Sequence, residues 1–462
     1  MITYQDYLRY EQTDVARAQF VRTAIEDYKG SEEYQTARIA EEYDRCRNTT
    51  TMQYQKYLTD IRGVQYQDKT ATVHRSTSNF FNIFTTQLNQ YLLGNGVTWK
   101  GKVDLDNDFD IQLQKAGKAA LIGGVSFGFW NLDHLVVFKA TEFVPMRDEE
   151  NGALRMGIKF WQLSGEKPLR ATLYELDGYT DFLFTQTQKD DPSEEWQKID
   201  DGVYMMEKLP YKLKIRTSEA DGREIYGWEN YPSFPIVPLW GNPNHQSELV
   251  GMREKIDAYD FILNGWEDDL DNAQIYWIIR GAGGMDDPDL AKFLDRLRTV
   301  KAAAPEDGQD VQPVTVNIPV DARERLLERL ERQLYRDAMI MNPEDIAGGA
   351  ATATQIKAAY ERQNVKADQY EYCVLEFISA ILEVAGKTAE ASFTRSVIVN
   401  TTEEVQTLVQ AASFLSQEYV TEKILQLLGD GDQAQEVLKA KTAEAMENMA
   451  MAAEMQNMTG GA

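Results

Sequence analysis

A regularly spaced apolar stripe between residues 249 and 270 constrains the fold of this chain more than any other feature. Its members follow one another at alternating intervals of three and four residues, and they are Leu249, Met252, Ile256, Tyr259, Leu263, Trp266 and Leu270. Apolar residues at this spacing share one face of an α-helix. The pattern therefore predicts a long, straight helix that buries this face against neighbouring helices.

A second amphipathic pattern begins at Asp321, whose carboxylate can cap a helix while Glu324 reaches back to it. Its apolar positions are Leu327, Leu330, Leu334, Ala338 and Met341. Pro343 ends the pattern, because the residue before a proline is disfavoured in the α conformation. The chain thus carries two long helices that flank a compact insertion, and a loop with Gly348 and Gly349 follows directly.

Bulk properties limit the classes of function. A chain of 462 residues can bury a large core and should form more than one domain. Its 48 Lys and Arg against 74 Asp and Glu give a net charge of −26. Such a surface repels nucleic acid, so tight neutralisation of phosphates is not expected. A repelled polymer can nevertheless pass through a protein without binding to it.

The two cysteines, Cys46 and Cys373, lie far apart in helical patterns. They are expected to be free thiols in a reducing compartment, without a disulfide framework. The sequence shows neither a signal peptide nor a run of about 18 apolar residues, the length that a membrane span needs. We therefore expect a soluble protein made in the cytosol.

The period of the apolar pattern changes along the chain. Helices are expected within residues 1–48, 76–93 and 109–121. Residues 126–239 are rich in aromatic and β-branched residues, and Asn-Gly and Asp-Gly pairs at 151, 177, 201 and 221 interrupt them. Such pairs are strong hairpin signals and predict a mostly antiparallel meander of about six to nine strands. A proline-rich connector at 232–243 follows.

The remaining segments are read in the same way. The insertion at 273–318 reads as a strand at 274–280, a helix at 288–300 and a strand at 311–318. A third long helix is expected at 354–385, and further helices at 401–445. The Met-rich end is expected to be frayed.

The sequence contains partial matches to metal-binding and nucleotide-binding motifs, but none is complete. Asp104, Asp106 and Asp108 imitate a calcium loop, but Phe109 replaces its glycine and Lys115 its bidentate glutamate. The glycines at 281–284 lack the frame of a nucleotide-binding loop, and the adjacent acids would repel a phosphate. The histidines at 74, 134 and 245 share no metal-ligand spacing. We expect no catalytic residue, no metal and no cofactor.

Several local patterns, taken in order, resemble the portal proteins of tailed bacteriophages of the long-tailed type. They are residues 91–99 (Tyr-Leu-Leu-Gly-Asn-Gly-Val-Thr-Trp), the helix–glycine–strand entry at 119–130, the strand at 143–145, the connector and helix at 238–264, the Thr- and Ala-containing pattern at 351–357, and residues 393–395 and 415–418. The resemblance covers about residues 70 to 440. Gln355 and the pair Asn95-Gly96 depart from the family pattern.

The resemblance implies an α+β portal fold with long stem and wing helices, a mostly antiparallel β-rich wing and a small α/β clip. It also implies a cyclic ring of about twelve subunits. The implied division is a wing at 1–246, a first stem helix at 247–272, a clip at 273–318, a second stem helix at 319–341, a tunnel loop at 342–353, a long wing helix at 354–390, and a crown with a C-terminal tail at 391–462.

The implied function is that of a non-enzymatic channel at one vertex of a phage head. Double-stranded DNA would pass through it during packaging, be retained, and leave at ejection. The implied partners are further copies of the chain, the large terminase, the head-to-tail adaptor, and the major capsid and scaffold proteins, without a membrane. The protein would reside in the virion and, during assembly, in the host cytoplasm.

The resemblance also places candidate site residues. The tunnel-loop candidates are Asn342, Glu344, Asp345, Ile346, Gly348 and Gly349. The stem and channel candidates are Arg323, Arg325, Arg329 and Arg332, and the clip candidates for partner binding are Asp286, Asp287, Lys292 and Arg296. The stem arginines alternate with glutamates, so they either form ion pairs along the helix, line the channel, or bridge subunits.

Two other classes of protein remain as alternatives. A minor head or scaffold-type protein would use the heptad helix in a small coiled-coil oligomer. An acidic, aromatic-rich glycoside hydrolase would need two carboxylates across a sugar cleft. No such pair stands out in the sequence, and the formation of a ring would separate both alternatives from the portal class.

Overall fold

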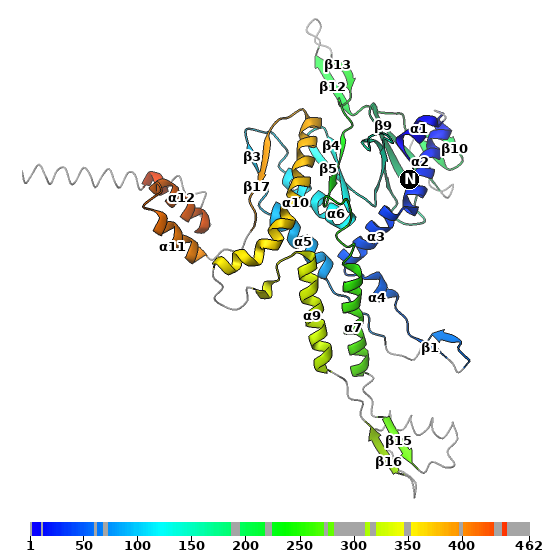
Figure 1. Ribbon diagram of the computed structural model, residues 1–462. Coiled ribbons are helices and arrows are strands. Elements are labelled where there is room, and N and C mark those ends of the chain that lie inside the picture. The colour runs from blue at the N-terminus through cyan, green and yellow to red at the C-terminus, as the bar shows by residue number, and fades with distance from the viewer. Residues whose placement is uncertain are drawn as a thin grey trace, which may run out of the picture.

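The computed structural model describes residues 2–10, 13–59, 62–67, 73–185, 195–217, 224–271, 276–280, 310–314, 320–345, 353–396, 401–428 and 437–440. A broad body of sheets and helices lies at one end, and two helices that lie side by side, α7 and α9, project from it (Figure 1). A small ribbon, β15–β16, lies beyond their far ends, and α11 and α12 lie to one side of the body.

Four N-terminal helices begin the chain, and they are α1 (Tyr4–Arg9), α2 (Asp14–Gly30), α3 (Glu32–Asp44) and α4 (Thr49–Gln53). Thr3 and Asp6 form a capping box at α1, and the Ser31 side chain accepts a hydrogen bond from the backbone N–H of Tyr34 at α3. Helix α2 ends at Gly30, and Ser31 caps the next helix.

A six-stranded antiparallel sheet forms the outer part of the body. Its order is β10-β11-β9-β8-β7-β6, with β6 (Phe143–Arg147), β7 (Leu154–Trp161), β8 (Leu169–Glu175), β9 (Gly178–Phe184), β10 (Gln197–Asp200) and β11 (Val203–Met205). Its apolar face packs against α2 in one core that includes Val21, Ile25 and Phe182. The antiparallel meander predicted from the sequence is confirmed.

The predicted hairpin turns at the Asn-Gly and Asp-Gly pairs are confirmed where the structure describes them. Gly152 lies between β6 and β7 with a φ of +69°, and Gly202 lies between β10 and β11 with a φ of +70°. These backbone conformations suit glycine, which has no Cβ to clash. The prediction of six to nine strands was too low, because the described residues between 125 and 240 form eleven strands, several of only three to five residues.

The central core lies where a three-stranded sheet meets three helices. The sheet has the order β14-β4-β5, with β4 (Val125–Asn131), β5 (His134–Lys139) and β14 (Ile236–Trp240). The helices are α5 (Phe80–Leu93), α6 (Phe109–Gly123) and α10 (Ala353–Ala385). Strand β14 corrects the reading of 232–243 as a connector. Pro238 is tolerated there because β14 is an edge strand that pairs only with β4.

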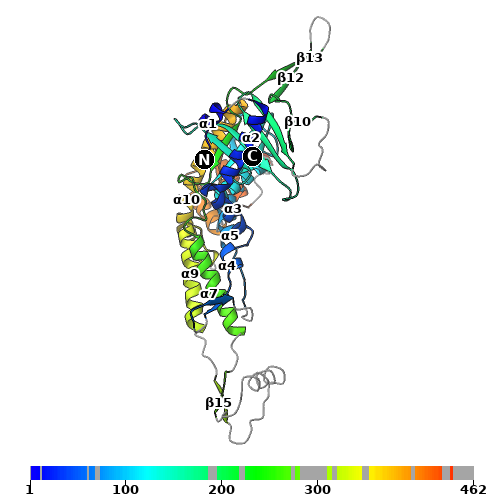
Figure 2. The same cartoon turned by 90° about the vertical axis from the view of Figure 1, so that its right-hand side faces the viewer.

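The projecting helices are α7 (Arg253–Asp271) and α9 (Val320–Ala338), and we call this pair the stem. Figure 2 shows from a second direction that they run side by side. The first predicted stem segment starts at residue 247, but the helix itself begins at Arg253 after a series of turns. The third long helix, predicted at 354–385, is confirmed by α10.

Four two-stranded ribbons and two C-terminal helices complete the described chain. The ribbons are β1 (Tyr57–Thr59) with β2 (Gln65–Gln67), β3 (Val97–Lys100) with β17 (Glu390–Phe393), β12 (Lys212–Thr217) with β13 (Glu224–Glu229), and β15 (Tyr276–Arg280) with β16 (Asp310–Val314). The helices are α11 (Thr401–Ala411) and α12 (Gln417–Leu428). Among the described helices, none combines the length and apolarity needed to cross a membrane.

Candidate functional site

Ion pairs at both ends fix how the two stem helices lie against each other. Near the body, the Lys255 ammonium lies 2.6 Å from the Asp337 carboxylate. Near the far end, Arg323 pairs with Asp269. The helices are therefore antiparallel, and the ribbon β15–β16, which lies between them in the sequence, is at the far end of the stem (Figure 1).

Aromatic packing joins the stem to the body. Phe80 at the start of α5 lies edge-on to Tyr259 of α7, with ring centroids 5.0 Å apart. Phe84, one turn further on, lies edge-on to Tyr335 of α9 at 5.1 Å. Each such pair contributes about 0.5–1.5 kcal/mol beyond its burial. The stem is thus held on the body by packing as well as by charge.

The heptad stripe of α7 is only partly the buried face. Its first members, Leu249, Met252 and Ile256, are buried, but Leu270 at the end is 56% exposed. In the second half of the helix the buried positions are polar, and they are Asp260, Asn264 and Asp268. Spacing by four residues places these three on one side of the helix. The sequence analysis missed this polar row.

The polar row of α7 binds the extended segment 73–79 and the start of α4. The Asp260 carboxylate accepts hydrogen bonds from Asn48 Nδ2 at 2.5 Å and from the Ser78 backbone N–H at 3.0 Å. Asn264 exchanges two hydrogen bonds with the backbone of Ser76, at 2.7 and 2.9 Å. Burial raises the pKa of Asp260, and the hydrogen bonds that it accepts only partly offset this effect.

Asp268 ends the polar row with two basic partners. Its carboxylate lies 2.6 Å from the Lys56 ammonium and 2.7 Å from His74 Nδ1, and it accepts the His74 backbone N–H at 2.8 Å. Burial alone would raise its pKa, but the hydrogen bonds from Lys56 and His74 outweigh burial and lower the pKa. One face of α7 is thereby bound to residues 48–78, while another face packs on α9.

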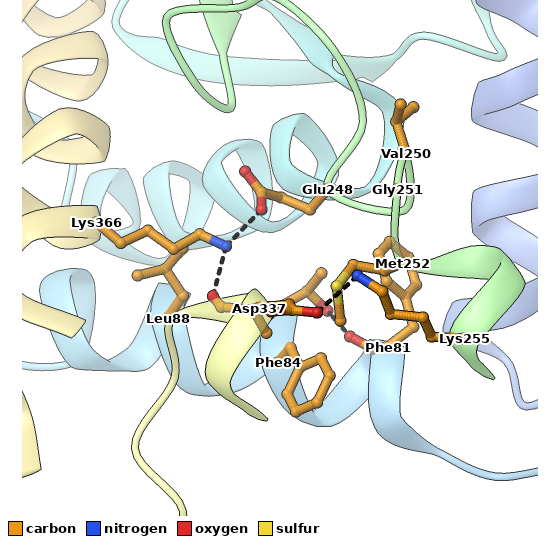
Figure 3. Close-up of a pocket in the computed structure, with 12 residues that line it drawn as sticks. Phe81, Phe84, Leu88, Glu248, Val250, Gly251, Met252, Lys255, Asp337 and Lys366 are labelled. Carbon is orange, nitrogen blue, oxygen red and sulfur yellow. Dashed lines mark hydrogen bonds and ion pairs between the residues drawn. The ribbon is translucent and has the colours of Figure 1, made fainter. Parts of the chain in front are cut away.

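A lysine of α10 ties both stem helices to the body. The Lys366 ammonium lies 2.5 Å from the Glu248 carboxylate, just before α7, and donates to the Ala338 backbone carbonyl at 2.8 Å (Figure 3). Met339 follows with a φ of +56°, and the Ile340 N–H bonds back to the Tyr335 carbonyl, which closes the C-terminus of α9. A cavity of about 180 Å³ lies beside this junction, lined by Phe84, Leu88 and Met252 among others.

The predicted stem arginines have different environments. Arg323 is partly buried and pairs with Asp269 in the same chain, and Arg332 forms an exposed pair with Glu328 at 3.0 Å. Arg325 and Arg329 are exposed and form no ion pair with any described residue. Their spacing places Arg325, Arg329 and Arg332 on one face of α9, opposite its buried residues Leu327, Leu334 and Ala338.

This basic face is larger than the sequence analysis recognised. Arg336, four residues after Arg332, lies on the same face of α9. A surface hollow there is lined by Arg329, Arg332, Gln333 and Arg336. A neighbouring hollow is lined by Arg332, Arg336 and Arg362 of α10. The spacing at 325, 329, 332 and 336 in the sequence was a sufficient signal for Arg336. Arg362 could not be found in this way, because another helix supplies it.

Only the start of the predicted tunnel loop is described. Asn342 is buried, and its Oδ1 accepts the Glu344 backbone N–H at 3.1 Å, so this side chain shapes a turn. A short 3₁₀ turn, η1 (Pro343–Asp345), follows, and Glu344 is exposed. Burial, then the charges of Glu344 and Glu328, raise the pKa of Glu331. Ile346, Gly348 and Gly349 lie outside the described residues.

The predicted clip contacts cannot be placed, because Asp286, Asp287, Lys292 and Arg296 all lie outside the described residues. The predicted strands on either side of them are present as β15 and β16, which pair antiparallel. Within the described ranges, no group of three or more His, Cys, Asp or Glu is placed to hold a metal ion.

A β-rich body, a stem of two antiparallel helices and a ribbon at its far end together make up the portal fold that the sequence implied. A family model described as phage portal protein, SPP1 Gp6-like, matches residues 28–448. The chain belongs to this family of phage portal proteins.

Two curated relatives are portal proteins. That of Bacillus phage SPP1 is 26% identical over 405 residues, which cover 80% of this chain and 76% of the relative. That of Clostridium phage phiCD119 is 25% identical over 196 residues, which cover 40% of this chain and 44% of the relative.

Two similar solved structures come from gene transfer agent (GTA) particles. One is the neck of an empty GTA particle, with 13% identity, coverage of 75% of this chain and 89% of that chain, and a TM-score of 0.42. The other is the virion of a native GTA particle, with 15% identity, coverage of 75% and 87%, and a TM-score of 0.38. The family assignment does not depend on either.

Proposed function

We propose that this portal protein assembles into a closed ring of about twelve subunits, through which double-stranded DNA enters a phage head, is retained and later leaves. Membership in the portal family carries the proposal. The described stem supports it, because two antiparallel helices held to the body at several points form a stiff rod. Nineteen residues in each helix give a rod about 28 Å long, enough for a channel wall.

The charge of the stem fits a channel that does not hold DNA tightly. Helix α7 carries seven acidic and only two basic residues, while α9 carries five of each. Duplex DNA must slide past this wall, and a wall that neutralised many phosphates would stall it. We propose a mainly acidic channel with sparse basic contacts, and we propose that the exposed stem arginines bridge neighbouring subunits.

We propose further roles for individual segments of this chain because it belongs to the portal family. Residues 273–318 are proposed as the clip, which docks the large terminase during packaging and later the head-to-tail adaptor. Residues 342–353 are proposed as a tunnel loop that touches DNA, and residues 391–462 as the crown inside the head. Contacts with the major capsid and scaffold proteins would place the ring at one vertex of the virion after assembly in the host cytoplasm.

The tunnel-loop proposal has its own test. In a phage that uses this chain as its portal, Gly348→Pro together with Gly349→Pro should impair packaging or DNA retention, because proline fixes φ where glycine allows a mobile turn. Packaged DNA per particle, measured by quantitative DNA extraction, reports the effect. Unchanged packaging and retention would exclude a role for the loop in contacting or gating DNA.

The ring itself is tested by the mass of the purified full-length chain in solution. Light scattering after size-exclusion chromatography should give about twelve times the 52.7 kDa of one chain, because cyclic rings are closed assemblies. A persistent dimer or trimer would favour the coiled-coil class instead. The structure gives that class little support, because α7 already packs on α9 of the same chain.

A further inference from the structure

The ribbon β1–β2 projects from the stem without a partner in its own sheet. It belongs to the segment 54–67, which we call the arm, and each of its two strands has only three residues. Tyr57 is 59% exposed, Tyr66 is 52% exposed, and all three residues of β2 are exposed. An isolated two-stranded ribbon is marginal in water unless a helix or a further strand packs on it. We therefore expect another part of the assembly to pack against the arm.

The base of the arm, in contrast, is firmly attached to α7. The Tyr54 ring lies edge-on to Phe261 with centroids 5.1 Å apart, and the Lys56 ammonium lies 2.6 Å from the Asp268 carboxylate. Figure 1 shows β1 on the side of α7 that faces away from α9, and Figure 2 shows it alongside the stem. The arm is thus aimed outward from one flank of the stem.

The opposite flank of the stem carries the basic face of α9. Arg325 and Arg329 are exposed and form no ion pair with a described residue, and the Arg332 pair with Glu328 is exposed to solvent. Leu326 beside them is 44% exposed. This flank therefore offers free guanidinium groups, one apolar side chain and the hollow between Arg329 and Arg336.

A cyclic ring brings these two flanks together. In such a ring the interface is heterologous, so one flank of each subunit meets the other flank of the next, without a shift along the ring axis. The pairs Lys255–Asp337 and Asp269–Arg323 set the level of α7 against α9. Interpolation between them places Phe261 and Asp268, where the arm is attached, level with residues 331 and 324 of α9. The arm and the basic face therefore lie at the same height.

We propose that the arm of each subunit packs on the basic face of α9 in the next subunit, with Tyr66 against Arg325, Arg329 and Leu326. Tyr57 lies on the other face of the ribbon, because Tyr66 is paired with Leu58 and successive residues of a strand alternate between faces. The inference rests on the proposed ring. Tyrosine rings and guanidinium groups are chemically complementary, because a flat cation stacks on the negative face of an aromatic ring. The occupant of the basic face is thus a second copy of this chain rather than DNA. This arrangement also agrees with an acidic channel, because Arg325 and Arg329 then lie between subunits and not on the channel wall.

A photo-crosslinker at the arm tests the contact in the assembled protein. With p-benzoylphenylalanine in place of Tyr66, illumination of the full-length ring should produce a ladder of covalently joined chains. Mass spectrometry of the joined peptides should place the crosslink within residues 320–338. The same replacement at Trp228, on a ribbon at the far end of the body from the stem (Figure 1), should give no crosslink to residues 320–338. Crosslinks from position 66 to any other element, or only within one chain, would overturn the contact.

Variants on the two sides of the contact test its contribution to assembly. Tyr66→Ala, and separately Arg325→Ala with Arg329→Ala, should each raise the protein concentration needed for ring formation about tenfold, the effect of losing about 1.4 kcal/mol. Combining all three substitutions should add little more, because both variants remove the same contact. Additive effects would contradict the inference. So would arginine variants that assemble normally but retain duplex DNA less well, because DNA would then be the partner of this face.

The outcomes separate this inference from the proposed function. Rings that crosslink elsewhere leave the portal assignment in place and remove only the arm contact. A full-length protein that forms no ring at any concentration would remove the basis of both.

Discussion

At the scale of single residues, Gly117 of α6 shows how closely the central core is packed. A Cβ at this position would lie 2.0 Å from the Tyr370 hydroxyl and 2.6 Å from Asn89 Oδ1. The Tyr370 hydroxyl donates to that same oxygen at 2.8 Å, and Tyr370 is fully buried. Glycine at 117 therefore lets α6 pack closely against the hydrogen bond that joins Asn89 of α5 to Tyr370 of α10.

We expect Gly117→Ala to lower the free energy of unfolding by about 2–3 kcal/mol, because the methyl group displaces Tyr370 and breaks its hydrogen bond. Denaturant titration followed by circular dichroism measures the change. The matched control is Gly265→Ala in α7, where a Cβ meets nothing within 4 Å. There the same substitution should raise stability by about 0.5–1 kcal/mol. Equal effects at the two glycines would contradict this view of the core.

The buried carboxylate of Asp260 should make stability depend on pH. Its folded-state pKa is raised above the ordinary value of 3.8, so the folded chain keeps this proton to a higher pH than the unfolded chain. The stabilising contribution is therefore complete below the unfolded pKa and is lost as the pH rises through the folded pKa. Asp260→Asn cannot titrate, so stability relative to this variant should fall from about pH 4 upward. Thermal unfolding across pH measures the trend, and a constant difference would refute it.

At the scale of elements, the Lys366 junction should matter more than the exposed ion pairs of the stem. Its side chain is 16% exposed and that of Glu248 is 18% exposed, while the Arg332–Glu328 pair is 66% and 55% exposed. A partly buried charge that loses its partner is costly, whereas water screens an exposed pair. Lys366 also satisfies a terminal carbonyl of α9, so it fixes the angle at which the stem leaves the body.

Lys366→Met should accordingly destabilise the chain by about 1–3 kcal/mol, because Glu248 and the Ala338 carbonyl both lose a partner. Arg332→Gln, the control on the exposed pair, should change stability by less than about 0.5 kcal/mol. Chemical denaturation of both variants measures these changes in the free energy of unfolding. A Lys366→Met variant as stable as the control would mean that packing alone holds the junction.

The elements themselves were largely predictable from the sequence, because they depend on local patterns. The stripes at 249–270 and 327–341 and the turn pairs at Gly152 and Gly202 marked real elements. The predicted stop at Pro343 was too late, because α9 ends at Ala338, where Met339 takes a positive φ. The polar row at Asp260, Asn264 and Asp268 was missed, although its spacing by four was visible. It was missed because the partners lie some 190–210 residues earlier in the chain, and only the fold brings them together.

Long-range contacts also limited the prediction of the candidate site. The sequence could place Arg323, Arg325, Arg329 and Arg332 on one helix, but it could not distinguish Arg323, which pairs with Asp269, from the exposed Arg325 and Arg329. Asn342 looked like a polar loop residue, yet it is buried in a turn. The outward direction of the arm depends on its attachment to Phe261 and Asp268, which no local pattern reveals.

At the scale of the whole molecule, the net charge of −26 should govern contact with DNA. The assembled ring should bind duplex DNA only weakly near physiological salt, because few phosphates can be neutralised by an acidic wall. Fluorescence anisotropy of a labelled duplex, titrated with rings at several salt concentrations, measures this. Strong binding that weakens steeply with salt would contradict an acidic channel.

Electron microscopy of the purified protein would show its assembly. We expect closed rings of about twelve subunits around a central hole, with the stems of neighbouring subunits side by side around that hole. A monomer or a small oligomer that persists at high protein concentration and in the presence of scaffold protein would exclude such a ring.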